Sequence, residues 1–129
     1  MVASMPAAKT ETQAQDDFNQ AIAMAKQGYY ALAAKKFRMS AMAGHGRGMF
    51  YLGLLFSRGD GVPQSLFHAV LWLSLAELEG IPEAASAKIQ LLPGLTAKQL
   101  IACQREAANR WEQIQQLSQH HTSSLPAIS

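Results

Sequence analysis

Apolar residues recur along the chain at intervals of three and four, which places their side chains on one face of an α-helix. In the segment over residues 17–26 (DFNQAIAMAK) these residues are Phe18, Ala21, Ile22 and Ala25. No segment alternates apolar and polar residues over a convincing length, so the sequence predicts an all-α fold. Further helical segments are expected over residues 29–43, 49–56, 66–79, 82–92 and 96–117.

The stretch over residues 51–64 shows how such helices end. It reads YLGLLFSRGDGVPQ, an apolar run followed by two glycines, Val and Pro. A phosphate-binding loop would need Lys-Ser or Lys-Thr after the glycines, or a strand before them, and neither is present. The helical spacing on both sides argues against a β-hairpin. We therefore predict a helix–helix turn, in which glycine stops one helix, Pro63 prevents its continuation and Ser65 caps the next.

Capping residues and composition predict the domain boundaries. Thr10 with Gln13, and Thr96 with Gln99, have the spacing of a capping box, so the first and last helices are expected to begin there. The expected division is a flexible arm over residues 1–10, a helical repeat domain over residues 11–118 and a flexible tail over residues 119–129.

The helices come in pairs, and the pairs resemble one another. Gly44 and Gly80 lie 36 positions apart. The same offset relates Ala33 to Ala69, Phe37 to Leu73 and Ser40 to Ala76. A period in the thirties with small residues inside paired helices is typical of a helical solenoid. We expect a short α-solenoid of about three antiparallel helix pairs, with a long C-terminal closing helix.

Residues 44–80 resemble one complete Sel1-like repeat, a relative of the tetratricopeptide repeat with a glycine-rich loop between its two helices. The matching positions are Gly44-His-Gly-Arg-Gly48, Leu52-Gly53, Phe56, Gly59-Asp-Gly-Val-Pro-Gln64, Ala69-Val70, Trp72, Ala76 and Gly80. Residues 15–43 resemble a degenerate first repeat without the loop motif, and residues 82–118 resemble the terminal unit of such arrays. Gly46 and Gly48 depart from the pattern, because alanine is usual there. Each glycine is expected to weaken the start of its helix by roughly 1 kcal/mol.

The resemblance implies a non-catalytic adaptor or scaffold, because arrays of this family hold peptides or partner proteins, often in bacterial signalling, envelope or host-contact systems. Stacked helix pairs present a concave surface for this purpose. The first helix of each pair is expected to line it. The predicted partner-binding groove consists of Gln15, Phe18, Ile22, Lys26, Arg47, Phe50, Leu54, Ser57, Arg58, Glu83, Ser86 and Gln90. The alternative for Phe50 and Leu54 is that they pack in the core.

The closing helix leaves a second function open. Its apolar positions Trp111, Ile114 and Leu117 lie past the point that three helix pairs could cover. They either fold back on the array or form a surface for self-association. The alternative function is therefore a self-associating structural module, and the chain is expected to be a monomer or a weak homodimer.

Composition narrows the class of protein. The chain has 129 residues, of which 49% are hydrophobic and 16% charged, as expected for one globular domain. The net charge of +2 is too small to favour nucleic acid as a partner. No apolar run is long enough to insert into a membrane, and no apolar leader stands at the start. As written the chain is expected to be cytoplasmic, or periplasmic or secreted if a leader was removed.

No constellation of residues predicts catalysis or metal binding. His45, His68, His120 and His121 form no ligand pattern with Cys103, the single cysteine. Cys103 lies on the apolar face of the closing helix and is expected to be a small buried residue. No pair of carboxylates is spaced for acid–base chemistry. We expect no catalytic residue, no metal and no cofactor, and a protein that is not an enzyme.

Overall fold

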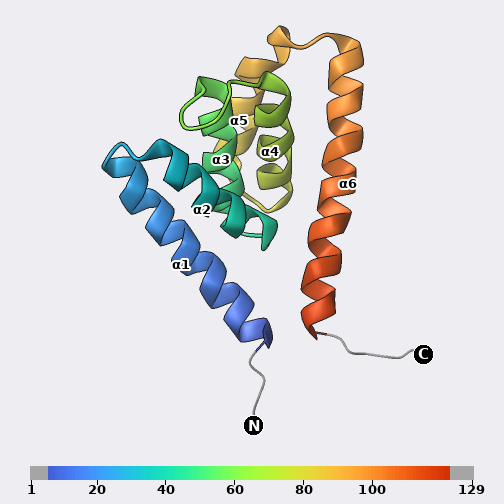
Figure 1. Cartoon of the computed structure of the whole chain (residues 1–129). Helices are drawn as coiled ribbons and strands as arrows, with labels where there is room; N and C mark the ends of the chain where they lie inside the picture. Colours follow the sequence, from blue (N-terminus) through green and yellow to red (C-terminus); the bar gives the residue numbers. More distant parts are fainter. Residues whose placement is uncertain (1–5, 123–129) are drawn as a thin grey trace, which may run out of the picture.

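The computed structural model describes the backbone of residues 6–122 and the side chains of residues 11–117. Over this range the chain is all helical, without strands, as predicted (Figure 1). The helices are α1 (Pro6–Lys26), α2 (Tyr30–Met42), α3 (Gly46–Arg58), α4 (Leu66–Leu78), α5 (Pro82–Leu91) and α6 (Ala97–Thr122), with a short 3₁₀ turn, η1 (Leu92–Gly94), between α5 and α6.

The helices pack in an order that follows the sequence, except for the last one. α1 packs on α2, α2 on α3, α3 on α4 and α4 on α5. α6 instead packs mainly on α4, and it also contacts α1. The third pair, α5 and α6, is therefore open, because these two helices do not pack closely on each other. α6 instead runs back along the array toward α1 (Figure 1).

The first and last helices extend beyond their expected ends. α1 begins at Pro6 and not near Thr10, so part of the expected arm is helical. Proline is favourable in a first helical turn, where its missing N–H needs no partner. α6 continues to Thr122, into the expected tail. The rest of the arm and tail, residues 1–5 and 123–129, lies outside the described residues.

The turn between α3 and α4 has the predicted structure. Gly59 ends α3 in the left-handed conformation, with φ at 75°. Gly61 also has a φ of 75°, and a Cβ there would overlap the backbone of Tyr30 at the start of α2. Ser65 caps α4 by accepting a hydrogen bond from the backbone N–H of His68 at 3.1 Å. The two glycines thus serve both the turn and the packing of the loop on the first repeat.

The start of α6 confirms the second capping box. The Gln99 side chain accepts a hydrogen bond from the backbone N–H of Thr96 at 2.9 Å. The Thr96 hydroxyl accepts one from the N–H of Gln99 at 3.0 Å. Two N–H groups that the helix itself cannot satisfy are therefore paired.

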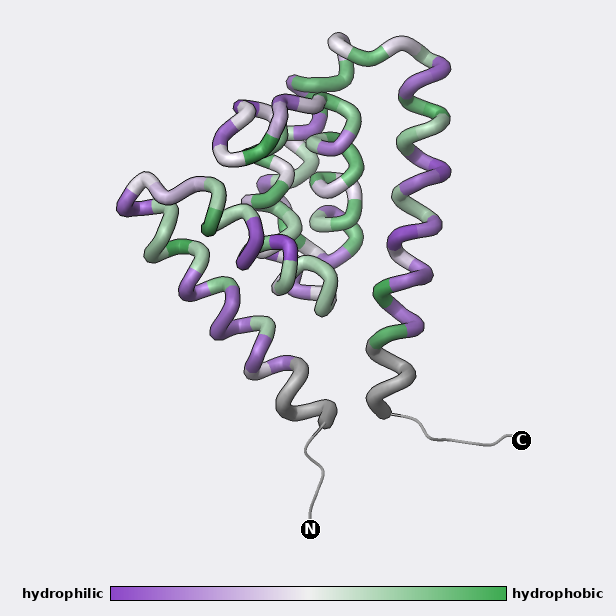
Figure 2. The backbone as a smooth tube through the Cα atoms, viewed as in Figure 1, coloured by the Kyte–Doolittle hydropathy of each residue, from purple (hydrophilic) through white to green (hydrophobic). Residues whose placement is uncertain are grey.

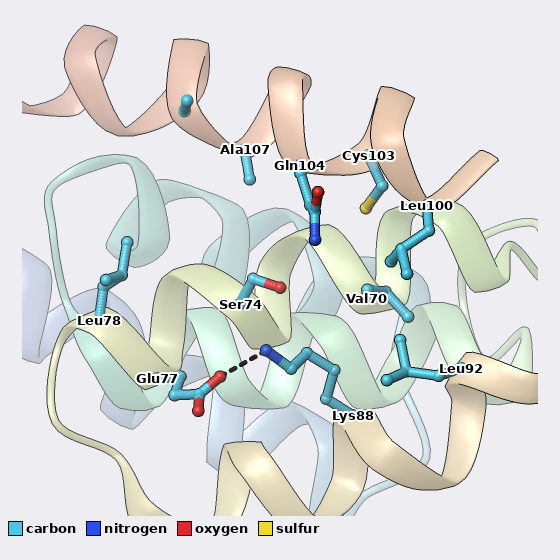
Figure 3. A pocket seen from close by; sticks show the side chains of 11 residues that line it. Val70, Ser74, Glu77, Leu78, Lys88, Leu92, Leu100, Cys103, Gln104 and Ala107 are labelled. Carbon is cyan, nitrogen blue, oxygen red and sulfur yellow. Dashed lines mark hydrogen bonds and ion pairs between the residues drawn. The ribbon is translucent and has the colours of Figure 1, made fainter. Parts of the chain in front are cut away.

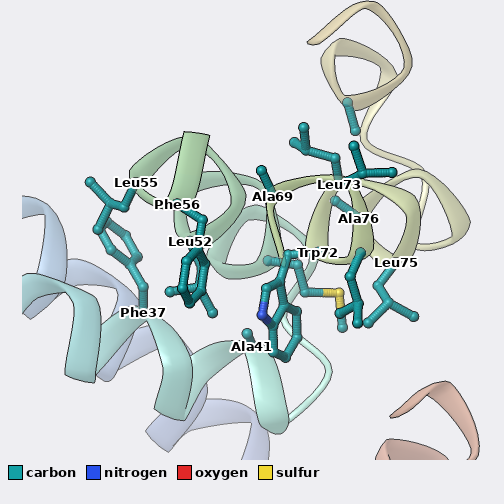
Figure 4. Close-up of a cluster of buried hydrophobic side chains, with 14 of the residues drawn as sticks. Phe37, Ala41, Leu52, Leu55, Phe56, Ala69, Trp72, Leu73, Leu75 and Ala76 are labelled. Atoms are coloured by element: carbon teal, nitrogen blue, oxygen red, sulfur yellow. The ribbon is translucent and has the colours of Figure 1, made fainter. Parts of the chain in front are cut away.

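The core is centred on α4. Residues 69–73, Leu75 and Ala76 of this helix are all buried, so α4 is apolar on every side (Figure 2). Trp72 and Phe37 are the largest side chains buried there, with Leu52 of α3 between the helices (Figure 4). A helix that is hydrophobic all round must be covered all round. Here α3, α5 and α6 cover it.

Small residues let α3 approach its neighbours closely. α3 begins at Gly46, earlier than predicted, and its first turn lies against other helices. A Cβ on Gly48 would overlap the buried hydroxyl of Ser40 in α2. A Cβ on Gly46 would lie 2.9 Å from the Cβ of Glu79, and one on Gly53 2.9 Å from Cγ of Leu73. The glycines that depart from the repeat pattern therefore occupy positions with no room for alanine.

The closing helix is only partly covered by the array. Cys103, Ala107 and Ile114 are buried on its inner face. Trp111 and Leu117 are 40% and 49% exposed. Of the three residues expected to act together, Ile114 therefore packs within the chain and the other two are partly exposed. No helix in the described part of the chain is long and apolar enough to cross a membrane.

We predict that Gly48→Ala destabilises the protein, although alanine is the better helix former. The added methyl must displace Ser40, at a cost of about 2 kcal/mol, against a propensity gain of about 1 kcal/mol. Urea unfolding followed by circular dichroism measures the difference. Adding Ser40→Ala removes the overlapping hydroxyl and should recover part of the loss. A Gly48→Ala variant more stable than the parent would show that α3 can move away from α2.

Candidate partner-binding groove

A groove opens between α1 and α3, with the start of α2 at its side. It encloses about 380 Å³. Its lining is apolar and aromatic with two cations at the edge, and consists of Ile22, Ala25, Lys26, Tyr30, Phe37, Tyr51, Leu54, Leu55 and Arg58. Helical spacing explains this set, because residues three and four apart share one helix face. α1 contributes positions 22, 25 and 26, and α3 contributes positions 51, 54, 55 and 58.

Two rings of the groove lining, Phe37 and Tyr51, belong to a larger cluster of aromatic rings. The rings of Phe37 and Tyr51 stack with their centroids 5.4 Å apart and their planes 13° apart. Phe18 meets Phe37 edge-on at 5.8 Å, and Phe50 meets Tyr51 edge-on at 5.4 Å. Such pairs stabilise beyond the area they bury. The packed rings of Phe37 and Tyr51 present an apolar surface to the groove.

Positive charge lies at both ends of this aromatic cluster. Lys26 and Arg58 line the groove itself. Arg47 lies above the rings of Phe18 and Tyr51, at 6.0 and 5.9 Å from their centroids. None of these three cations makes an ion pair within the described side chains. No carboxylate is among the residues that line the groove.

The structure brings together four of the residues predicted for the groove: Ile22, Lys26, Leu54 and Arg58. Four more surround them. Phe18 is 8% exposed and lies within the aromatic cluster, Phe50 packs half-buried against the core, and Arg47 covers Phe18 from outside. The Ser57 hydroxyl donates to the carbonyl of Leu54 at 2.7 Å, within its own helix.

The other predicted residues lie elsewhere. The Gln15 side chain bonds His45, at the N-terminal end of α3. Glu83, Ser86 and Gln90 are exposed on α5 and are not part of the groove lining. They were assigned to the groove by assuming that the third pair repeats the first two. Because α6 packs on α4 and leaves that pair open, α5 does not continue the groove.

Three aromatic residues of the groove were missing from the prediction. Tyr30 and Phe37 belong to α2, the second helix of its pair, and Tyr51 belongs to α3 but was not among the positions assigned to the groove. The spacing of Tyr51, Leu54 and Arg58 was the available signal, because these positions share one helix face. α2 can line the groove only if α1 and α3 lie far enough apart. The distance between two helices leaves no local pattern in the sequence.

His45 joins α1 to the N-terminus of α3 beside the groove. Its Nδ1 accepts the backbone N–H of Gly48 at 3.1 Å, so Nε2 carries the proton and donates to Oε1 of Gln15 at 3.1 Å. The ring also lies 4.8 Å from that of Phe18. Burial lowers the pKa of His45, and the charge of Arg47 lowers it further. Burial, the charge of Arg47 and the N–H of Gly48 directed at Nδ1 therefore favour the neutral ring.

This geometry predicts a pH dependence of stability. The pKa of His45 lies lower in the folded chain than its ordinary value of 6.5, so the unfolded chain binds more protons between the two values. Stability from this group is fully present above 6.5 and declines as the pH falls toward the lowered pKa. His45→Asn keeps a capping side chain but does not titrate there. The urea midpoint of the parent should fall relative to that of His45→Asn as the pH drops through this window; parallel curves would contradict the assignment.

A second pocket, of about 470 Å³, lies where the third pair opens, between α4, α5 and α6 (Figure 3). Lys88 and Glu77 form an ion pair of 2.6 Å at its edge. Cys103 contributes to its wall, where the thiol donates to the carbonyl of Phe67 at 3.3 Å. Burial raises the pKa of the Cys103 thiol, against the lowering effect of Lys88. A thiol held protonated is a poor nucleophile, so this pocket offers no evident reactive group.

The structure also bears on metal binding. Among the described residues, no group of three His, Cys, Asp or Glu side chains is placed to hold a metal ion. His120 and His121 lie outside the side chains that the structure describes.

No family model and no curated protein matches this sequence. A solved structure does match it: the crystal structure of c5321, a protective antigen present in uropathogenic Escherichia coli strains that displays an SLR (Sel1-like repeat) fold. The TM-score is 0.71 and the sequence identity 21%, over 88% of this chain and 26% of that one. The chain thus spans about a quarter of that protein. The match confirms the repeat architecture expected from residues 44–80, and the chain has the Sel1-like repeat fold.

Proposed function

We propose that this protein is a non-catalytic adaptor that holds a peptide or a segment of a partner protein in the groove between α1 and α3. The supporting observation is the groove itself, an open concavity with a rigid aromatic floor and apolar walls. Apolar and aromatic lining with a few polar groups at the edge is typical of binding sites. Helical arrays commonly bind their partners on an extended concave surface, and the groove is formed by the first helices of two successive pairs.

Leu54 is the side chain with which to test this proposal. Leu54 lines the groove and is partly exposed. A charge at this position should therefore weaken binding of the partner without unfolding α3. We predict that Leu54→Asp lowers affinity for groove-bound peptides at least roughly tenfold, because an unpaired carboxylate replaces apolar contact. The measurement is selection of a random linear peptide library displayed on phage, followed by titration of the selected peptides.

Leu32→Asp is the matched control. Leu32 lies on α2, is 50% exposed and is not part of the groove lining. Peptides selected on the parent should bind this variant unchanged. If no peptide is enriched, or if Leu54→Asp binds every selected peptide as well as the parent does, the groove is not the binding site.

Self-association through α6 is the second candidate, favoured by the exposure of Trp111 and Leu117. Light scattering distinguishes the two functions. The adaptor proposal predicts a monomer across the concentrations used for binding. A dimer that Trp111→Glu with Leu117→Glu dissociates, and that Ile101→Glu leaves intact, would favour the alternative. Ile101 is a suitable control because it is 56% exposed on the same helix.

A further inference from the structure

We infer that the partner segment is acidic, with an apolar or aromatic side chain inserted between α1 and α3 and carboxylates bound by Lys26 and Arg58. This inference rests on the proposed function, because it names the chemistry of the segment that the same groove would hold. Charge complementarity and the size of the space between the apolar residues of the lining support it.

The charge of the groove has one sign. Lys26 ends α1 and Arg58 ends α3, and both line the same pocket. Asp60 follows Arg58 by two residues but forms no ion pair with it. Asp17, on α1, is buried and pairs with Lys36 of α2 at 3.7 Å. The groove therefore holds two cations without an anionic partner from the described part of the chain.

Two other cations beside apolar surface do have such partners, whereas Arg38 and Arg47 lie over aromatic rings without an ion pair to a described side chain. Lys88 pairs with Glu77 at 2.6 Å, and Arg110 pairs with Glu106 at 3.4 Å while lying over the ring of Trp72. A cation in the last turn of a helix is favourable for the helix dipole alone. That effect explains a basic residue at each helix end, but it does not require both to face one apolar pocket. A carboxylate from a partner would complete both sites.

The apolar part of the groove determines what else the segment must carry. Ile22, Leu54 and the rings of Tyr30 and Tyr51 surround a space of about 380 Å³, enough for a large side chain together with its adjoining backbone. Burying such a side chain supplies affinity, whereas charges at an exposed edge mainly supply specificity and faster association. A nucleic acid is disfavoured, because its binding requires many clustered phosphate contacts and the groove provides few cations.

The test uses the same phage-displayed library of random linear peptides. Selection on the full chain should enrich Asp and Glu next to an aliphatic or aromatic residue. Reversing both charges, with Lys26→Glu and Arg58→Glu, should lower the affinity for the selected peptides at least roughly tenfold. The matched control, Lys98→Glu with Arg105→Glu, makes the same change in net charge on exposed positions of α6 and should leave binding unchanged.

Reversed charges at two helix ends oppose the helix dipoles and could unfold the protein. A second pair of substitutions therefore removes both charges without reversing them. Lys26→Gln with Arg58→Gln should keep the urea midpoint close to that of the parent. Its affinity for the acidic peptides should depend less on salt than that of the parent, because fewer charges take part.

The outcomes separate the inference from the proposed function. Peptides that depend on Leu54 but show no excess of acidic residues, or that bind the Gln pair with unchanged affinity and salt dependence, would overturn the acidic partner and leave peptide binding intact. A single-stranded oligonucleotide that displaces the peptides at equal concentration would also overturn it. Absence of any Leu54-dependent peptide would overturn both.

Discussion

The need to cover α4 on every side shapes this protein more than any other constraint. Its buried residues lie all around the helix, so the helix is stable only where neighbours remove each face from water. α3 comes close enough because Gly53 presents no side chain to Leu73. α5 and α6 cover the remaining faces, although they barely pack on each other. The packing of α3, α5 and α6 follows from this single helix.

The groove is a by-product of the same arrangement. α2 packs on both α1 and α3, and the aromatic rings of Phe18, Phe37 and Tyr51 lie in the wedge between these helices. The wedge is wide enough that the rings do not fill it, and the remaining space is the groove. Its floor therefore belongs to the hydrophobic core. A binding surface built in this way is rigid before any partner arrives, which lowers the entropy lost on binding.

Local chemistry explains why most of the fold was predictable. Glycine stops, proline breaks and the Thr96 capping box act within a few residues, and the structure has helices wherever these signals predicted them. The groove was predictable in part, because Ile22, Lys26, Leu54 and Arg58 follow from helical periodicity alone. The rest depends on distances between helices. Neither the entry of Tyr30 into the groove nor the exclusion of α5 leaves a local pattern in the sequence.

The path of α6 changes how the array holds together. In an open solenoid each repeat contacts only its neighbours, so an end can fray while the middle stays folded. Here α6 packs on α4 and also touches α1, which links the last helix to the first across the whole domain. Ile114 of α6 lies within reach of Gly44, at the junction of the first and second repeats. Loss of either end removes contacts from the other, so unfolding should be a single cooperative event, as in a globular domain and unlike an extended array.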